Sequence, residues 1–201
     1  MREVVAILRG VTPNEVVAIS EGLLETGIQQ VEVPLNSPQA VESIALISEA
    51  FGADALIGAG TVLTTEQVDA VADAGGKLII SPNCNPAVIK RSKELGLTSL
   101  PGVLTPTECF AALESGADGL KFFPAFKLGL DGFNAFSAVL PNDVKTYAVG
   151  GVGAEDFADW LAAGITGFGI GSALYKPGDT VEVVRRKAET MVAAWDGAVA
   201  E

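Results

Sequence analysis

Lys121 is the residue whose position most directly suggests chemistry. It lies in residues 119–124 (GLKFFP), which are otherwise almost entirely apolar, and such a run is typical of a strand buried on both faces of a parallel sheet. A buried ammonium is costly unless it is paired or loses its proton. A neutral lysine amine is a nucleophile that can form a Schiff base with a carbonyl group. The structural alternative is a lysine that reaches solvent from the end of a strand.

The composition removes several classes of function. The chain has no histidine, which excludes Ser-His and Cys-His nucleophilic pairs and every histidine-ligated metal site. A net charge of −12 over 201 residues argues against binding nucleic acid through its phosphates. No stretch approaches the ~20 apolar residues of a membrane span, and the apolar run before Arg9 is too short for a signal peptide. We expect no membrane or nucleic-acid partner and a cytoplasmic protein.

The two cysteines, Cys84 and Cys109, form neither a disulfide framework nor a CxxC motif,. They are expected to be free thiols in a reducing compartment.

The elements that must position Lys121 follow a regular alternation. Helical patterns end at a glycine five times, at Gly27, Gly75, Gly96, Gly116 and Gly164, and a short apolar strand follows each,. A capping residue before proline predicts helix starts at Thr12-Pro13, Ser37-Pro38 and Thr105-Pro106,. A longer helix is predicted near residues 180–196. Eight strands are predicted, at residues 4–9, 29–34, 55–59, 77–81, 97–101, 118–123, 145–149 and 167–171.

Strands that alternate with helices predict parallel βαβ units. Eight such units in about 200 residues correspond to a small TIM barrel, so we expect an α/β fold with a single (β/α)8 barrel domain over residues 1–201. The alternative is an open doubly wound sheet. No GxGxxG motif follows the first strand, and the even spacing of the strands favours the barrel.

Three charged residues should meet at the mouth of such a barrel, where strands end and chemistry is located. Arg9 and Glu32 lie near the ends of the first two predicted strands, and Lys121 lies in the sixth. The structural alternative is a buried ion pair, but such pairs are weak devices for stability, and two cations around one acid exceed what stability requires. A single carboxylate does not hold a divalent ion, so no metal is expected.

Glycines follow the last two strands, as Gly150-Gly151 and Gly171-Ser172. Loops at these places in a barrel often present backbone N–H groups to a phosphate. A pair of glycines can also be an ordinary turn, but two pairs in the two expected loops favour a phosphorylated small molecule as ligand.

These residues together resemble a known family, the 2-keto-3-deoxy-6-phosphogluconate/6-phosphogalactonate aldolases. The similarity extends over essentially the whole chain in the same order. It is carried by residues 6–10 (AILRG), 31–38 (VEVPLNSP), 57–62 (IGAGTV), 120–124 (LKFFP), 149–152 (VGGV) and 169–172 (GIGS).

The resemblance implies a role for each matching residue. Lys121 would form the Schiff base, and Glu32 would move protons. Arg9 and Thr61 would hold the keto-acid end of the substrate. Phosphate would bind at Gly150, Gly151, Gly171 and Ser172. The resemblance further implies an enzyme without metal or cofactor, usually a homotrimer, that acts on a phosphorylated keto-sugar acid and yields pyruvate.

Val149 indicates which substrate epimer is preferred. Gluconate enzymes of the family usually have threonine before the Gly-Gly pair, whereas this chain has Val149, and residues 34–38 (PLNSP) also resemble the galactonate branch. The expected activity is therefore a phosphogalactonate aldolase. The alternatives are a phosphogluconate aldolase with the same mechanism and a non-catalytic barrel that binds phosphosugars. Residues 125–129 (AFKLG) match neither branch, which leaves the role of Lys127 open.

Overall fold

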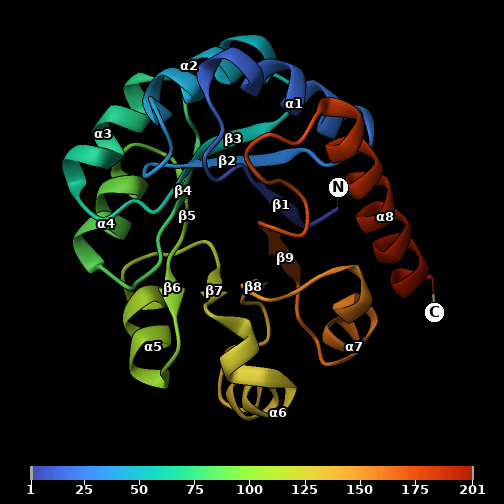
Figure 1. Ribbon diagram of the computed structural model, residues 1–201. Coiled ribbons are helices and arrows are strands. Elements are labelled where there is room, and N and C mark those ends of the chain that lie inside the picture. The colour runs from blue at the N-terminus through green and yellow to red at the C-terminus, as the bar shows by residue number, and fades with distance from the viewer. Residues whose placement is uncertain (1, 201) are drawn as a thin grey trace.

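The computed structural model describes residues 2–200, which form a (β/α)8 barrel (Figure 1). Figure 1 shows the strands at the centre and the helices in a ring around them. The strands are β1 Val4–Ile7, β2 Gln30–Pro34, β3 Leu56–Gly60, β4 Leu78–Ile80, β5 Thr98–Leu100, β6 Gly102–Val103, β7 Leu120–Phe122, β8 Thr146–Val149 and β9 Gly167–Ile170. The helices are α1 Pro13–Glu25, α2 Ala40–Phe51, α3 Thr65–Asp73, α4 Pro86–Glu94, α5 Pro106–Glu114, α6 Ala125–Ser137, α7 Phe157–Ala162 and α8 Val181–Val199, with a short 3-10 turn, η1, at Ala154–Asp156.

All strand pairs in the sheet are parallel, in the order β5-β4-β3-β2-β1-β9-β8-β7-β6. The predicted fifth strand, 97–101, corresponds to β5, which ends before Pro101, and an additional strand, β6, begins directly after the proline. The Ser81 N–H donates to the Leu100 carbonyl on one side (3.2 Å), and the Lys121 N–H donates to the Pro101 carbonyl on the other (2.9 Å). One chain segment therefore closes the sheet, and the predicted barrel is confirmed.

The helix starts follow the sequence signals with one exception. Thr12 and Thr105 cap α1 and α5, each with proline at the first helical position. The predicted start at Ser37-Pro38 is wrong, because α2 begins at Ala40. The Ser37 hydroxyl instead accepts a hydrogen bond from the Gly10 N–H (2.9 Å), so this residue joins two loops at the barrel mouth.

Apolar side chains fill two separate cores. The larger core lies between the sheet and the helices, and includes Phe157 stacked on Phe168 with ring centroids 4.0 Å apart. The smaller core fills the inside of the barrel and contains Val5, Ile7, Leu78, Ile80, Leu100, Tyr147 and Val149. These residues alternate along their strands, because successive side chains of a strand point to opposite faces.

The amino-terminal end of the barrel is closed by a polar network around Glu3. Its carboxylate accepts hydrogen bonds from Lys145 Nζ (2.7 Å), Gln30 Nε2 (2.8 Å) and the Tyr147 hydroxyl (2.8 Å). Burial by itself would raise the pKa of Glu3, but these three donors together hold it below its usual value of 4.5. The network links the starts of three strands, β1, β2 and β8.

We expect Glu3→Gln to lower the free energy of unfolding by about 1–3 kcal/mol at neutral pH, because buried donors lose a charged acceptor. Because the pKa of Glu3 is lower in the folded protein than in the unfolded chain, its ionisation stabilises the fold at pH values above about 4.5, the pKa of the unfolded chain,. This stabilisation is lost as the pH falls through the lower pKa of the folded protein. The difference between wild type and variant should therefore shrink below pH 4.5. Urea denaturation at several pH values measures it.

Glu25→Gln is the matched control, since Glu25 forms a half-exposed ion pair with Arg185 and such pairs contribute about 0–1 kcal/mol. Equal effects of the two substitutions would contradict the role assigned to Glu3.

Candidate active site

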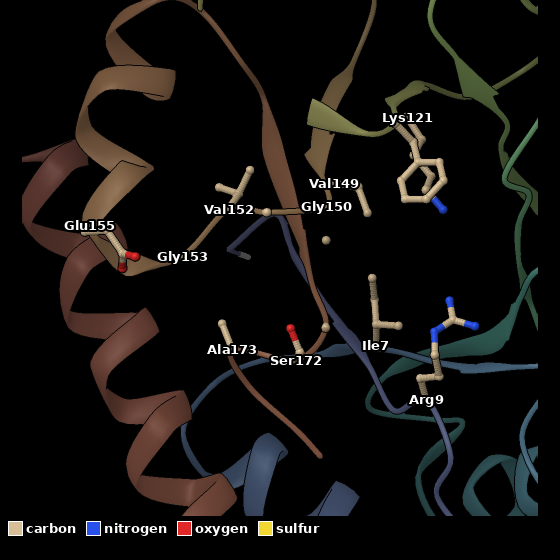
Figure 2. A pocket seen from close by; sticks show the side chains of 14 residues that line it. Ile7, Arg9, Lys121, Val149, Gly150, Val152, Gly153, Glu155, Ser172 and Ala173 are labelled. Carbon is tan, nitrogen blue, oxygen red and sulfur yellow. The ribbon is translucent and has the colours of Figure 1, made fainter. Parts of the chain in front are cut away.

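A cavity of about 300 Å3 opens at the carboxyl ends of the strands. Figure 2 shows Lys121 and Arg9 on one side of it and Ser172, Gly153 and Glu155 on the other. Its lining residues are Ile7, Arg9, Lys121, Phe123, Val149, Gly150, Gly151, Val152, Gly153, Glu155, Gly169, Gly171, Ser172 and Ala173. The cavity is thus built from the ends of β1, β7, β8 and β9.

Lys121 projects from β7 into the barrel and is only 6% exposed. Burial lowers the pKa of its ammonium; Glu32 opposes this shift, and Arg9 adds to it. The amine lies over the ring of Phe123, with Nζ 4.7 Å from the ring centroid. Burial thus disfavours the charged form of this lysine, and the neutral amine is the nucleophilic form.

Glu32 projects from β2 and is 1% exposed. Burial raises the pKa of its carboxyl from 4.5 to about 7, although Lys121, Arg9 and a backbone hydrogen bond from Gly60 each favour the charged form. Within residues 2–200 its Oε2 atom has no hydrogen-bond partner. A carboxyl that titrates near neutral pH is suited both to take a proton and to return it.

Gly60 makes room for this carboxylate. A Cβ atom at position 60 would collide with the carboxylate of Glu32, so β3 approaches β2 closely enough for its backbone to bind the acid. The next residue, Thr61, has a φ of 58°, an uncommon conformation for a β-branched residue. Thr61 follows β3 at the same end of the barrel but is not among the residues that line the 300 Å3 cavity.

Arg9 is held in place by the loop that follows β2. Its Nη1 donates to Asn36 Oδ1 (2.5 Å), and the hydrogen bond between Gly10 and Ser37 fixes the same pair of loops. The guanidinium lines the cavity beside Lys121. A planar, permanently charged guanidinium matches a carboxylate group.

The distal end of the cavity offers backbone donors. Gly150 and Gly151 have φ values of 94° and 71°, in the left-handed region that favours glycine. Within residues 2–200, no hydrogen bond engages the N–H groups of Gly150, Gly151 or Ser172. Val149 lies at the inner edge of this end, at the close of β8. Backbone N–H groups clustered in this way suit an anion.

The structure brings together most of the residues that the sequence singled out, and it adds three. Phe123 could have been found, because it shares the strand face of Lys121. Asn36 and Glu155 gave no sequence signal, because their contacts depend on loops from distant parts of the chain. Lys127 lies outside the cavity lining, with Nζ 5.2 Å from the ring centroid of the exposed Phe126.

The cysteines lie apart from the residues that line the cavity. Cys109 is buried in α5, and Cys84 is half-buried after β4; both are free thiols. Among residues 2–200, no three Asp, Glu or Cys side chains come together as a metal-binding group. No helix in that range is long and apolar enough to cross a membrane.

The fold and the site define a class of protein: a parallel barrel with a buried lysine and a buried carboxyl group at its mouth. Comparison with known proteins specifies it further. The family model for KDPG and KHG aldolases matches residues 1–186, and the chain belongs to this family.

Individual relatives are similar over nearly their full length. A probable 2-dehydro-3-deoxy-6-phosphogalactonate aldolase of Rhizobium meliloti is 51% identical over 97% of this chain and 92% of its own. The 2-dehydro-3-deoxy-6-phosphogalactonate aldolase of Escherichia coli is 48% identical, over 97% and 95%. A solved structure described as native KDPGal superposes with a TM-score of 0.97 at 47% identity, covering 98% of this chain and 96% of that one.

Proposed function

We propose that the protein is a Schiff-base aldolase, a metal-independent carbon-carbon lyase. It cleaves 2-dehydro-3-deoxy-6-phosphogalactonate to pyruvate and D-glyceraldehyde 3-phosphate. The observation that carries this proposal is the buried Lys121 beside Glu32, with the pKa of the amine lowered and that of the carboxyl raised to about 7. Phosphosugar binding without catalysis would need neither group.

In the proposed reaction, Lys121 forms the covalent intermediate and Glu32 transfers the protons. The neutral amine of Lys121 attacks the C2 keto group, and loss of water gives an iminium that accepts electrons. Glu32 takes the proton of the C4 hydroxyl, the C3–C4 bond breaks, and its electron pair forms an enamine while the aldehyde leaves. Glu32 then returns a proton to C3, and water releases pyruvate from Lys121. One carboxyl group serves both proton transfers.

Substrate binding uses the two ends of the site. Arg9, oriented by Asn36, pairs with the substrate carboxylate, and Thr61 contributes from the loop beside Gly60. The phosphate accepts hydrogen bonds from backbone N–H groups at Gly150, Gly151, Gly171 and Ser172. Figure 2 shows Lys121 and Arg9 on one side of the cavity and Ser172 and Gly153 on the other, which supports this orientation of the substrate.

Val149 is the residue on which the epimer preference is expected to depend. The two epimers differ at C4, and the apolar Val149 side chain lines the cavity but cannot hydrogen-bond a substrate oxygen. We expect wild type to prefer the galactonate epimer, by roughly 10–200-fold if apolar contact alone discriminates. Val149→Thr should shift the ratio of kcat/KM values towards the gluconate epimer.

Both epimers yield the same products, so the assay is kcat/KM measured separately with each pure epimer. Val152→Thr, at a nearby lining position, serves as the control variant. A wild type that prefers the gluconate epimer would contradict the assignment to galactonate and leave the aldolase mechanism intact.

The proposed domain organisation is a single barrel over residues 1–201. Three copies of this chain are proposed to assemble as a homotrimer. Family membership supports it, and the surface offers apolar side chains for an interface: Val41, Leu46, Leu63, Leu95, Leu104, Phe110 and Val139 are exposed. Light scattering at micromolar concentration should give a mass three times that of one subunit. A mass near 20.6 kDa would contradict the trimer.

The proposed location is the cytoplasm. The two free thiols, Cys84 and Cys109, suit a reducing compartment,, and fractionation of source cells would test it.

A further inference from the structure

One carboxylate in the cavity has no task in the reaction. Glu155 lies at the end opposite Lys121 and Arg9 (Figure 2). It is the only acidic residue among those that line the 300 Å3 cavity. Its side chain is exposed, and within residues 2–200 no side-chain hydrogen bond or ion pair engages its carboxylate. A side chain held only by solvent in this position is available to a ligand.

The backbone explains how the carboxylate comes to lie there. A Cβ atom on Gly153 would be 2.7 Å from Glu155 Oε2 and 2.9 Å from Oε1. The side chain therefore folds back over the Cα atom of Gly153, in space from which a Cβ atom would displace it. The Gly153 N–H is already occupied, because it donates to Asp156 Oδ2 (2.8 Å). The distal loop thus combines open donors at Gly150 and Gly151 with an open acceptor at Glu155.

The charges in the cavity are distributed unevenly. Both basic residues of the lining, Arg9 and Lys121, are at the keto-acid end, and the only acidic residue of the lining is at the distal end. A phosphate dianion there gains hydrogen bonds from backbone N–H groups but is repelled by Glu155. A neutral hydroxyl at the same place can donate a hydrogen bond to the carboxylate, which a phosphate dianion cannot do.

We infer that Glu155 determines how strongly the enzyme distinguishes substrates by their distal group. It weakens the binding of a terminal phosphate and accepts a hydrogen bond from a terminal hydroxyl. The site therefore also takes unphosphorylated 2-keto-3-deoxy sugar acids. This inference rests on the proposed aldolase function and concerns the end of the site remote from the bond that breaks.

The test compares kcat/KM for the phosphorylated and the unphosphorylated acid. In Glu155→Gln the ratio of phosphorylated to unphosphorylated activity should rise about tenfold, because one nearby negative charge is removed. Asp159→Asn is the matched control: it removes the same charge from the exposed surface of α7, outside the cavity lining, and should leave the ratio unchanged. A purely structural role of Glu155 would change both activities in parallel.

A second measurement does not depend on turnover. Inorganic phosphate should bind Glu155→Gln about tenfold more tightly than wild type or Asp159→Asn in calorimetric titrations. Equal affinity in wild type and Glu155→Gln, weaker binding by Glu155→Gln, or no measurable binding by either would overturn the inference. Failure of the aldolase function itself would appear separately, as wild-type Lys121 that forms no adduct with pyruvate.

Discussion

Lys121→Arg should abolish aldolase turnover, with a loss of about 10^4-fold or more in kcat, since the residue that forms the covalent intermediate is removed. A guanidinium stays protonated at any working pH and cannot form the imine. Coupled detection of pyruvate with 2-dehydro-3-deoxy-6-phosphogalactonate measures the loss.

Trapping identifies the residue directly. Borohydride added with pyruvate should reduce the imine to a stable adduct, and mass spectrometry of the digest should locate it on Lys121. Lys127→Arg controls for loss of an amine, because Lys127 is on the next helix but outside the cavity lining, and it should retain labelling. An adduct elsewhere, or turnover by a correctly folded Lys121→Arg, would exclude the mechanism.

Glu32→Gln should lower kcat by roughly 10^2–10^4-fold, the usual contribution of a positioned acid–base group. The carboxyl must be ionised to accept the C4 hydroxyl proton, and its pKa is raised to about 7. Wild-type kcat/KM should therefore rise with pH through about 7, and the variant should lack that limb. Stopped assays between pH 5.5 and 8.5 measure both profiles.

The same substitution should make the protein more stable at high pH. The pKa of Glu32 is about 7 in the folded protein and near 4.5 in the unfolded chain. Its contribution to stability is therefore complete below pH 4.5 and is lost as the pH rises through about 7. At pH 8 wild type bears a buried charge that glutamine lacks, a difference of about 3 kcal/mol. The gain for Glu32→Gln should be largest at pH 8 and should vanish near pH 4.5. Urea denaturation at both pH values would show it, and equal stability at pH 8 would contradict the burial of this charge.

The barrel could be predicted because its determinants are local. Short apolar strands and glycines that end helices recur along the chain, and no tertiary information is needed to count them. The burial of Lys121 and Glu32 could be predicted for a related reason, since both lie in strands that are otherwise apolar. Ser37 could not, because its hydroxyl accepts from Gly10 in another loop and so does not cap the helix beside it. Pro101 is predicted to end the fifth strand, but β6 follows it directly, because its carbonyl still accepts a hydrogen bond from the next strand although it has no N–H to donate,.

The distal end of the site was the least predictable part. The glycine loops were visible in the sequence, but the position of Glu155 depends on its return over Gly153. Likewise, the contact between Arg9 and Asn36 forms only when β1 and β2 lie side by side. Such contacts between loops follow from the closed barrel and not from the local sequence.

The apolar core inside the barrel has a kinetic consequence. Below Lys121 the interior leaves a space of only about 10 Å3, lined mainly by apolar side chains such as Val5, Ile80 and Leu100, which is barely the volume of one water and offers it few partners. Molecules can therefore reach the amine only from the mouth, past the glycine loops. In cleavage, we therefore expect the aldehyde to leave through the mouth before water enters by the same route to hydrolyse the iminium that forms once C3 is protonated. In synthesis, we expect pyruvate to enter first and the aldehyde second.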